Sequence, residues 1–362
     1  MAHAAIVYKY DEPMKIEEVT YRDLREGEVL VKMAACGVCH SDLSVLNMVI
    51  PCPTPVILGH EAAGVVEEVG PGVSDIVKGD HVIGIWKPSC GTCRLCRSGK
   101  GHLCELGANA TMTAMDRCKV GDTPVIEFLA VGGFSEYTIL TTTSLVKIDK
   151  SMPLDKAALL GCAVITGFGA AVNKASVQKG DSVAVFGCGG VGLNVIQGAV
   201  HNGAETIIAV DLDENKLEFA KTFGATHTMN AGNENLIKEL KALTVEKMGV
   251  DSSFDAVGHL GVIEQAAAVT CKGGNVVMVG VPKMTDKFDF HPFGEIFTEK
   301  PFMGTVAGSC TCRDALPELI GLYQNGELKL DELVTKTYPL NDINEAFDDI
   351  RSGKNARGVI VF

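Results

Sequence analysis

A glycine-rich turn between an apolar strand and an apolar helix constrains the fold of this chain more than any other feature. The turn follows the apolar run Ser182–Phe186 and opens a stretch, Val191–Asn202, whose apolar residues recur at helical spacing. Its glycines are Gly187, Gly189, Gly190 and Gly192. Asp211 stands at the end of the next apolar run, Thr206–Val210. Such glycines let the backbone approach a pyrophosphate at a helix N-terminus, and such an acid accepts hydrogen bonds from ribose hydroxyls, so the pattern predicts a dinucleotide site.

The acid at the end of the second run also indicates which dinucleotide is bound. Asp211 would repel a 2′-phosphate, and Leu212–Asn215 contains no arginine to receive one, so the sequence favours NAD over NADP. The same strand, turn and helix account for Ser182–Val200, the longest uncharged stretch of the chain. That stretch is long enough to be considered as a membrane span, but its five glycines break its apolar character.

The texture of the sequence divides the chain into two parts. Up to about residue 150, short β-runs bordered by turn residues predict mostly antiparallel strands, as at Val29–Ala34, Gly64–Val69, His81–Ile85 and Glu136–Leu140. From about residue 164, apolar runs alternate with helical segments, which predicts βαβ units and a doubly wound parallel sheet. The strands expected there are Val183–Phe186, Thr206–Val210, Asp255–Val257 and Asn275–Val279, and the helices are Val191–Asn202, Asn215–Phe223, Glu234–Met248 and Gly261–Cys271. Later we expect a helix over Asp314–Asn325, an amphipathic stretch over Ile343–Ser352 and a last strand, Arg357–Phe362.

Four cysteines lie within fifteen residues of a loop rich in Gly, Ser, Lys and Arg. They are Cys90, Cys93, Cys96 and Cys104. Four thiolates with short spacers close a tetrahedron around Zn²⁺ and leave no open position, which predicts a structural zinc site. An iron–sulfur cluster is one alternative, but a ferredoxin run has a three-residue last spacer followed by proline, whereas here seven residues precede the last cysteine and Glu105 follows it. Four unrelated buried thiols are the other alternative.

A second group of candidate metal ligands is dispersed along the sequence. Cys39 and His60 stand near each other, and Cys162 follows about a hundred residues later. Two cysteines and a histidine form one of the ligand sets of a catalytic zinc, which keeps a fourth position open. Taken singly, each has a simpler interpretation, since a lone cysteine is usually a small buried hydrophobe and a lone histidine a hydrogen-bonded one. Spacing alone therefore leaves this site open.

Charge and cysteine content exclude several classes of function. The 362 residues carry a net charge of −13, which opposes a general affinity for nucleic acid or an anionic membrane surface. Thirteen cysteines, an odd number, fit a reducing compartment with free thiols and metal ligands better than a complete disulfide framework. The first residues lack the basic region and apolar run of a signal peptide. We therefore expect a cytoplasmic protein with no nucleic-acid or membrane partner.

Together these motifs resemble those of the zinc-containing medium-chain alcohol dehydrogenases. The family stretch GHE-x2-G-x5-G-x2-V is present as Gly59-His60-Glu61, Gly64, Gly70 and Val73. The four-cysteine loop, the third-ligand segment Leu160–Cys162, the dinucleotide motif and the late segment Asn355–Val359 follow in the family's order. The resemblance spans essentially the whole chain. It implies a GroES-like, mainly β catalytic domain over 1–163 and 305–362, interrupted by a Rossmann NAD-binding domain over 164–304.

The resemblance also implies roles for individual residues near the metal. The residues similar to the catalytic zinc ligands are Cys39, His60 and Cys162. Asp42 resembles the carboxylate that orients His60, and Glu61 resembles the acid that lies behind the metal. Ser41 matches the hydroxyl that passes the proton of the alcohol toward the coenzyme ribose. These residues are the expected catalytic machinery.

Coenzyme contacts follow from the same resemblance. His40 stands where the family places a basic group on the pyrophosphate, so it is expected to contribute to both catalysis and coenzyme binding. Thr166 and Val191 are similar to residues that pack against the nicotinamide. Lys216 and Arg357 are similar to cationic coenzyme contacts, and a solvated surface charge is the alternative for both.

The expected substrate pocket includes an aromatic wall, and two positions, Ser44 and Ala108, depart from the family pattern. Trp86, the only tryptophan, stands where family members carry such a wall, with a core tryptophan as the alternative. Val281 and Ser41 are the other residues assigned to this pocket. The family relay ends in a histidine where this chain has Ser44, so the exit of the proton is open and His40 is a candidate substitute. Ala108 replaces the arginine of glutathione-dependent formaldehyde dehydrogenases, which disfavours glutathione adducts as substrates.

The expected activity is the reversible oxidation of a primary alcohol, with allylic and benzylic alcohols as candidates, to an aldehyde. It would use NAD and two zinc ions per chain, one catalytic and one structural. The long segment Glu105–Gly133 is typical of dimeric family members, so we expect a homodimer, with a tetramer as the alternative. The alternatives within the enzyme class are a physiological aldehyde reductase and a nicotinoprotein that retains its NAD. Outside that class, a zinc-binding redox sensor is the alternative.

Overall fold

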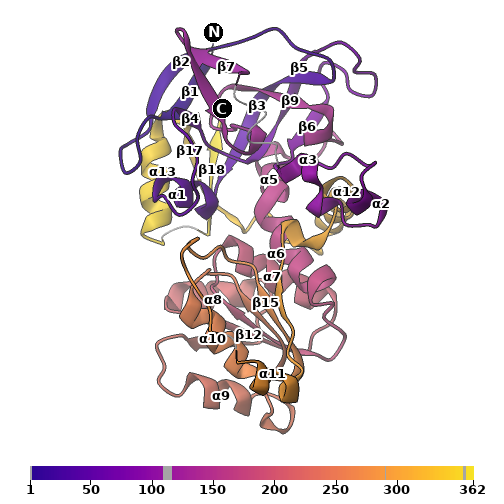
Figure 1. Ribbon diagram of the computed structural model, residues 1–362, viewed down its shortest axis with the longest axis vertical. Coiled ribbons are helices and arrows are strands. Elements are labelled where there is room, and N and C mark those ends of the chain that lie inside the picture. The colour runs from indigo at the N-terminus through magenta and orange to yellow at the C-terminus, as the bar shows by residue number, and fades with distance from the viewer. Residues whose placement is uncertain (1, 109–115, 290, 354–355) are drawn as a thin grey trace. The chain divides into compact units, whose positions relative to one another are not determined.

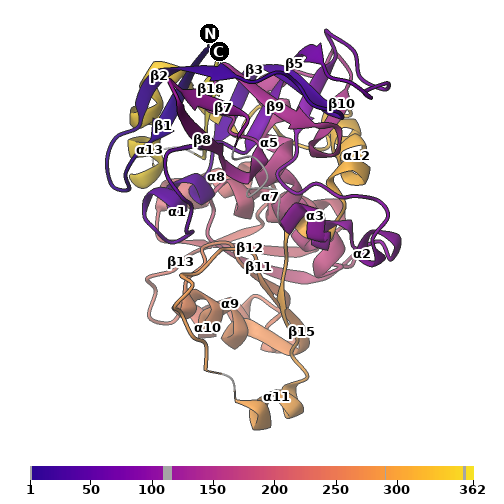
Figure 2. The same ribbon diagram turned by 45° about the horizontal axis from the view of Figure 1, so that its top comes forward.

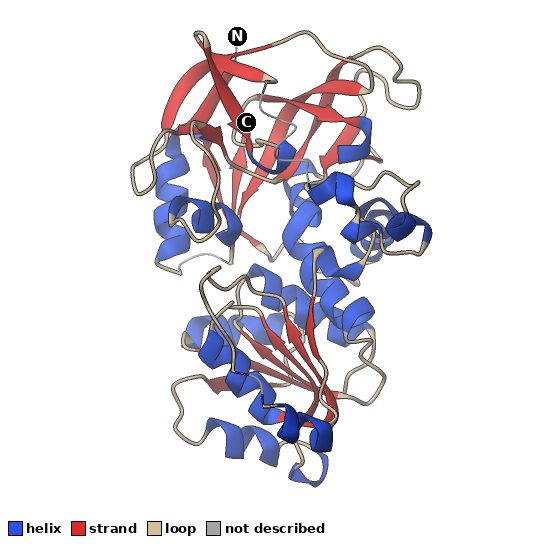
Figure 3. Ribbon diagram, viewed as in Figure 1, coloured by secondary structure: helices blue, strands red, loops and turns tan. Residues whose placement is uncertain are grey.

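The chain folds into two compact units. A computed structural model describes residues 2–108, 116–289, 291–353 and 356–362, so Asn355 of the late family segment lies outside the described residues. The first unit combines Met1–Ala163 with Cys310–Phe362, and the second is Val164–Ser309 (Figure 1). Strands dominate the first unit, whereas the second holds a sheet covered by helices (Figure 3). The fold is therefore mixed α/β, with a GroES-like part and a Rossmann part.

The strands of the first unit pair mostly antiparallel, as the short alternating runs predict. They are β1 (Ala2–Val7), β2 (Lys15–Tyr21), β3 (Glu28–Val38), β4 (Val56–Ile57), β5 (Glu61–Val69), β6 (His81–Gly84), β7 (Cys118–Val120), β8 (Thr123–Glu127), β9 (Tyr137–Thr141), β10 (Leu145–Ile148), β17 (Val334–Pro339) and β18 (Arg357–Val361). Among the described residues, β1-β2-β7-β8-β4 close a barrel, and β10-β6-β5-β3-β18-β17 form a larger sheet in which β9 also pairs with β3. The parallel exceptions are β4 with β8 and β17 with β18.

The register around β3 determines which loops meet. β3 and β5 pair antiparallel with Gly37 opposite Glu61, so the residue after β3 and the residue before β5 emerge at one edge of the sheet. β18 pairs with the same end of β3, with Gly358 opposite Val38. Cys39, His60 and Arg357 are thereby brought to one place, although more than three hundred residues separate Arg357 from Cys39.

The late part of the chain returns to the first unit and completes its core (Figures 1 and 2, yellow). The helices of this unit are α1 (His40–Leu46), α2 (Arg94–Arg97), α3 (Glu105–Ala108), α5 (Leu154–Leu159), α12 (Cys312–Gln324) and α13 (Ile343–Arg351). α13 is strongly amphipathic, with its apolar face buried, and Phe347 packs edge-on against Phe134 with ring centroids 5.9 Å apart. The amphipathic stretch expected over Ile343–Ser352 is therefore a helix.

The second unit contains a parallel six-stranded sheet. Its strands are β11 (Ser182–Phe186), β12 (Thr206–Asp211), β13 (His227–Asn230), β14 (Val250–Asp255), β15 (Thr270–Met278) and β16 (Phe302–Gly304). Their spatial order is β13-β12-β11-β14-β15-β16, which is the Rossmann order, with its switch point between β11 and β14. The helices are α6 (Ile165–Gly169), α7 (Gly190–His201), α8 (Glu214–Thr222), α9 (Leu236–Ala242), α10 (Leu260–Val269) and α11 (Pro292–Thr298).

Two elements of this unit differ from their predicted ranges. The strand expected over Asp255–Val257 is β14, which ends at Asp255, the residue where it was expected to begin. The polar residues Ser252 and Ser253 are buried in β14, so the sequence lacks the apolar run that marks a buried strand. The helix expected over Glu234–Met248 is a short α9, since the chain after it turns through Glu246 at a left-handed φ of 53°.

One helical stretch has the length and composition of a membrane span. Leu154–Lys174 covers 21 residues with a mean hydropathy of 1.4 over its most apolar window. Of that window, 78% is buried inside the structure, as expected for a core helix. The uncharged stretch Ser182–Val200 is instead divided between β11, the glycine turn and α7.

Candidate metal centres and dinucleotide-binding turn

Four buried side chains converge at the edge of the sheet where β3 ends and β5 begins. One ligand atom from each of Cys39, His60, Glu61 and Cys162 lies within 4.8 Å of the others. Cys39 precedes α1, and Cys162 comes from a π-helical turn, Leu160–Val164, that follows α5. The three ligands proposed from the sequence thus lie together, with Glu61 as a fourth member of the group.

The imidazole of His60 is oriented from one side and open on the other. Its Nδ1 lies 3.1 Å from Asp42 Oδ1, which also accepts a hydrogen bond from the Gly59 amide at 2.9 Å. The other ring nitrogen, Nε2, is buried and has no hydrogen-bond partner among the described residues. A buried nitrogen without a partner, next to two cysteine sulfurs, fits a metal ligand, so the group could hold zinc.

Charged groups behind the cysteines balance one another. Glu61 Oε1 accepts a hydrogen bond from the Ala163 amide at 3.1 Å and lies 3.2 Å from Arg357 Nη2. Arg357 also donates to the carbonyl of Val38 at 3.1 Å and is 3% exposed, so it is not a solvated surface charge. Burial raises the pKa of Glu61 to about 8, and the charge of Arg357 opposes that rise. A hydrogen bond from Cys162 holds the pKa of Cys39 well below its usual range, against burial and with help from Arg357.

Two aromatic rings lie perpendicular to the imidazole of His60. The Trp86 ring is perpendicular to the imidazole, with centroids 6.5 Å apart, and the Phe128 ring lies 5.9 Å away at 85°. Trp86 is half-buried and Phe128 is 3% exposed. Phe128 was not among the residues proposed from the sequence. In the sequence, Phe128 is an apolar residue at the end of a β-run and has no special mark. Its position beside the candidate metal ligand His60 results from the turn after β8, which the residue pattern does not reveal.

The expected proton-transfer residues occupy the first turn of α1. His40 is exposed and Ser41 is half-buried, directly after Cys39 in the chain. Asp42 is fully buried in the same turn, as its bond to His60 requires. Ser44, at the position where the family relay has a histidine, is half-buried one turn further along.

The four cysteines of the loop form a second compact group. Their Sγ atoms lie within 4.8 Å of one another, with 3.9 Å between Cys90 and Cys96, 3.5 Å between Cys93 and Cys96, and 3.9 Å between Cys93 and Cys104. Four thiolates around one zinc at about 2.3 Å place neighbouring sulfurs about 3.8 Å apart, so this group fits a tetrahedral zinc. Hydrogen bonds from Thr92 and the Cys93 amide lower the pKa of Cys90 to about 6, which favours the thiolate that a metal needs.

The glycine turn has the geometry that a dinucleotide requires. Gly187 adopts φ +92°, and a Cβ on Gly192 would lie 1.8 Å from the Gly187 carbonyl oxygen, so neither position accepts a side chain. Gly189 caps α7, whose first amides point out of the turn. Asp211 is held at the end of β12 by the amides of Cys188 at 2.7 Å and Asp213 at 3.0 Å.

The remaining predicted coenzyme and pocket residues are distributed over the second unit. Thr166 on α6 and Val191 on α7 are half-buried, and their helices pack so closely that a Cβ on Gly167 would meet the Val191 carbonyl at 2.2 Å. The Thr166 hydroxyl is buried without a hydrogen-bond partner among the described residues. Lys216 is half-buried on α8, and Val281 is 56% exposed after β15.

Comparison with known proteins gives matches along the whole chain. The alcohol dehydrogenase GroES-like domain matches residues 25–150, and the zinc-binding dehydrogenase domain matches residues 190–325. An NDMA-dependent alcohol dehydrogenase of Amycolatopsis methanolica is 41% identical over 99% of this chain and 98% of its own length. An S-(hydroxymethyl)glutathione dehydrogenase of Paracoccus denitrificans is 37% identical over 99% of both chains. The solved benzyl alcohol dehydrogenase of Acinetobacter calcoaceticus superposes with a TM-score of 0.93 at 32% identity, covering 100% of this chain and 99% of that one.

Proposed function

Because this chain belongs to the zinc-containing medium-chain alcohol dehydrogenase family, we propose that it oxidises a primary alcohol to an aldehyde, reversibly and with NAD as the hydride acceptor. One observation carries the proposal: the buried group of Cys39, His60 and Cys162, in which His60 Nε2 has no hydrogen-bond partner among the described residues. The first unit is then the catalytic domain and the second the NAD-binding domain.

The two metal groups divide between catalysis and structure. Cys39, His60 and Cys162 would hold the catalytic zinc, and the four cysteines of the loop would hold a structural one, which makes two zinc ions per chain. Bound at three protein ligands, zinc supplies a Lewis acid that lowers the pKa of an alcohol oxygen. Asp42 fixes the tautomer and orientation of His60, and Glu61 with Arg357 balances the charge behind the thiolates.

The proton of the alcohol leaves through the first turn of α1. Ser41, half-buried beside Cys39, accepts this proton, because its hydroxyl can accept one hydrogen bond while donating another. His40 is exposed at the start of the helix and carries the proton onward, since Ser44 cannot titrate in the physiological range.

The NAD site is assigned to the second unit, around its glycine turn. Bound NAD supplies the nicotinamide ring that accepts the hydride. The amides of the glycine turn hold its pyrophosphate and Asp211 its adenosine ribose. Thr166 and Val191 pack against the nicotinamide, and His40, Lys216 and Arg357 provide positive charge. Arg357 does so from its buried position beside Glu61.

The proposed substrates are primary alcohols with a flat apolar group. Trp86 and Phe128 place two aromatic rings beside His60, and a relative that superposes along the whole chain is a benzyl alcohol dehydrogenase. Ser41 and Val281 are the other pocket residues. Ala108 supplies no cation for a glutathione carboxylate, so S-(hydroxymethyl)glutathione is expected to be a poor substrate even though a 37% identical relative is named for it.

A nicotinoprotein is the second candidate function, and one observation favours it. The relative at 41% identity is named as NDMA-dependent. In that case NAD stays bound through the cycle and an external acceptor regenerates it. The physiological direction, alcohol oxidation or aldehyde reduction, depends on the coenzyme ratio in the cell.

The chain is further proposed to act as a cytoplasmic homodimer. α11 supports the assembly, since no residue of this described helix is buried and three large apolar side chains project from it, Phe293, Ile296 and Phe297 at 79%, 71% and 66% exposure. β16, which follows closely in the chain, is an edge strand of the six-stranded sheet.

One set of measurements tests this function. Purified protein should contain two zinc ions per chain and reduce added NAD with members of a panel of aliphatic, allylic and benzylic alcohols. The absorbance spectrum of dialysed protein distinguishes retained NAD from exchangeable NAD, and NDMA as acceptor then tests the second candidate. If the protein held no zinc at the Cys39 group and oxidised no alcohol with either acceptor, the result would favour the alternative of a zinc-binding redox sensor.

A further inference from the structure

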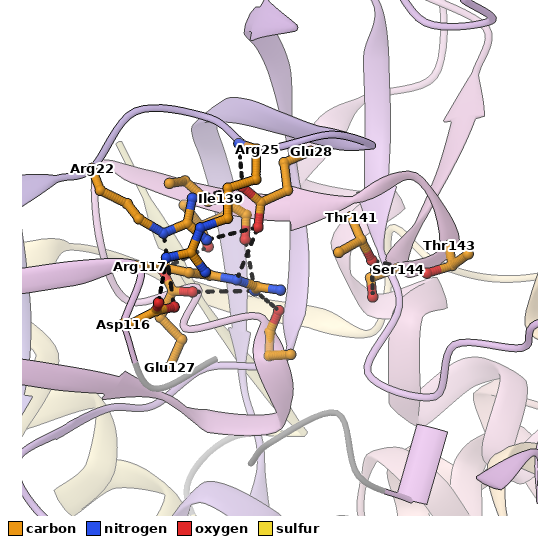
Figure 4. A network of polar contacts seen from close by, with 12 residues as sticks. Arg22, Arg25, Glu28, Asp116, Arg117, Glu127, Ile139, Thr141, Thr143 and Ser144 are labelled. Atoms are coloured by element: carbon orange, nitrogen blue, oxygen red, sulfur yellow. Dashed lines mark hydrogen bonds and ion pairs between the residues drawn. The ribbon is translucent and has the colours of Figure 1, made fainter. Parts of the chain in front are cut away.

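A buried ion pair in the barrel is not explained by the proposed reaction. Arg117 on the segment before β7 and Glu127 at the end of β8 are 3% and 0% exposed, and Arg117 Nη1 lies 3.3 Å from Glu127 Oε2 (Figure 4). Removing two charges from water costs about as much as their attraction returns, so a buried pair contributes little net stability. The pair therefore calls for a role other than stabilisation of the barrel.

Both members of the pair are tied to the turn that follows β8. Arg117 donates to the carbonyl oxygen of Ala130 at 3.1 Å and to that of Ile139 at 2.8 Å. Thr138 joins them, because its hydroxyl is 2.5 Å from the Val131 carbonyl oxygen and 3.3 Å from Glu127 Oε1. The ion pair and the threonine thus fix two successive carbonyl groups of the turn.

The turn needs such support because its backbone is strained. Leu129 and Ala130 adopt φ values of 52° and 58°, a left-handed conformation that non-glycine residues seldom take. Gly132 follows at φ +55°, and a Cβ there would lie 2.8 Å from Glu127 Cγ, so the turn packs directly on the Glu127 side chain. Strained residues of this kind persist where surrounding contacts determine them, and they cluster at ligand sites.

The first residue of the turn is the one that contacts the candidate metal ligand. Phe128 directly follows Glu127, and its ring lies perpendicular to the His60 imidazole with 5.9 Å between centroids. Phe128 lies between Glu127 and Leu129 in the chain, so the contacts that support the turn act on Phe128 through the backbone. Together with the Trp86 ring, whose centroid lies 6.5 Å from that of the same imidazole, the Phe128 ring flanks His60.

We propose that Arg117 and Glu127 are positioning residues that hold Phe128 against His60 and thereby set which alcohols the site accepts. The inference rests on the proposed function. An alcohol with an aromatic group fills the space that Phe128 bounds and is sensitive to the position of that ring. Ethanol is too small to need the ring. Breaking the Arg117–Glu127 ion pair therefore lowers the preference of the enzyme for the aromatic alcohol over ethanol. The oxidation reaction itself is retained.

A neighbouring carboxylate provides a matched control. Glu28 accepts two hydrogen bonds from Arg22, at 2.7 and 2.8 Å, and lies 4.0 Å from Arg117 Nε (Figure 4). It is 6% exposed and belongs to the same charged network. No hydrogen bond described in the structure links the Glu28 carboxylate to the turn. Glu28→Gln therefore removes a buried charge from the network without releasing Ala130 or Val131.

The test compares Glu127→Gln with Glu28→Gln in the zinc-loaded enzyme at pH 8.5, where Glu127 is ionised. The kcat/KM for benzyl alcohol should fall about 10-fold in Glu127→Gln, mainly through KM, because a displacement of about 1 Å in a positioning group has effects of this size or larger. The kcat/KM for ethanol should change less than about 3-fold, and Glu28→Gln should keep the wild-type ratio of the two alcohols.

A spectroscopic measurement separates this inference from the proposed function. With Co²⁺ in the Cys39 group, Glu127→Gln should shift the ligand-field bands relative to wild type, whereas Glu28→Gln should not. If the wild type oxidises neither alcohol, the proposed function fails and the cobalt spectra still decide the role of the pair. If Glu127→Gln does not fold, Thr138→Val replaces it and should lower the benzyl-to-ethanol ratio about 3-fold. Equal ratios and equal spectra in the wild type and the turn variant would overturn the proposal.

Discussion

Asp42 Oδ1 lies 3.1 Å from His60 Nδ1, and both side chains are buried, at 0% and 1% exposure. The contact fixes which imidazole nitrogen carries a proton and directs Nε2 toward Cys39 and Cys162. It exists because Asp42 lies in the first turn of α1 and His60 directly before β5, two positions that the pairing of β3 with β5 brings together.

Replacing Asp42 with asparagine should weaken metal binding. The side-chain amide of Asp42→Asn would keep an oxygen for the imidazole but lose the negative charge that makes His60 a better ligand. Loss of such a partner lowers metal affinity by roughly 10- to 100-fold. Competition with a chromogenic chelator measures this affinity. Asp75→Asn, an exposed carboxylate outside the site, should leave it unchanged.

Removing Cys39 should eliminate one of two metal ions. Cys39→Ala should reduce the zinc content from two to one per chain and abolish alcohol oxidation, because the buried ligand group loses a thiolate. The matched control is Cys52→Ala, a buried cysteine outside both metal groups. That variant should retain two zinc ions. Full activity in Cys39→Ala would exclude the assigned ligand set.

Coenzyme choice should respond to Asp211 in particular and not to acidic charge in general. Asp211→Ser removes the carboxylate held by the amides of Cys188 and Asp213, so use of NADP relative to NAD should rise by at least about 10-fold. Asp213→Ser is the control, because serine can still cap α8 at the Asn215 amide while one negative charge is lost. Steady-state kinetics with both coenzymes would contradict the assignment if the two variants behaved alike.

The buried carboxylates Glu127 and Glu28 should change the stability of the protein with opposite signs as the pH rises. Burial raises the pKa of Glu127 from 4.5 to about 7, although Arg117 lowers it. The folded state therefore holds this proton more firmly than the unfolded state. Its stabilising contribution is complete below pH 4.5 and is lost as the pH rises to about 7, on the order of 3 kcal/mol. The melting temperature of Glu127→Gln relative to wild type should thus increase from pH 4.5 to pH 7.

Glu28 should show the opposite sign. Desolvation works against its charge, but hydrogen bonds from Arg22 and the Arg25 amide lower its pKa below 4.5. Its contribution is therefore present above pH 4.5 and is lost as the pH falls through the folded-state pKa. The melting temperature of Glu28→Gln relative to wild type should rise only on the acid side. Parallel pH profiles for the two variants would contradict these assignments.

The apolar face of α11 should determine whether the protein is a dimer or a monomer in solution. Phe293→Asp places a charge on a side chain that is 79% exposed, so light scattering should change from the mass of two chains to that of one. Val245→Asp is the control, since Val245 is 80% exposed outside α11. A dimer that survives Phe293→Asp would place the interface elsewhere.

The second unit could be predicted from sequence to a large extent because its signals are local. A strand, a glycine turn and a helix are adjacent in the chain, and Asp211 follows within one βα unit. β14 was misplaced because Ser252 and Ser253 are buried polar residues whose hydrogen bonds come from elsewhere in the fold, such as the one between Thr270 and Ser253. A sequence pattern shows whether a residue is polar, but not whether its polar group has a hydrogen-bond partner in the folded protein.

The first unit shows what a sequence pattern cannot supply. Cys39, His60 and Cys162 were candidates, but their approach depends on the register of β3 with β5, which no spacing encodes. Arg117 and Glu127 would both be interpreted as surface charges from composition alone, yet they are buried against each other. Phe128 was missed for the same reason, because its importance arises from a strained turn.

The pairing of β18 with β3 has a consequence for synthesis of the protein. Arg357 donates to the carbonyl of Val38 across a separation of 319 residues, and β3 lies between β5 and β18 in the larger sheet. The first half of this unit therefore emerges from the ribosome with the Ala35–Val38 end of β3 unpaired on one side, since β9 covers only Glu28–Lys32, and with Glu61 lacking its cation. The whole second unit is translated before that gap closes. The nascent chain thus exposes a strand edge during most of its elongation, a period in which a chaperone can bind that edge.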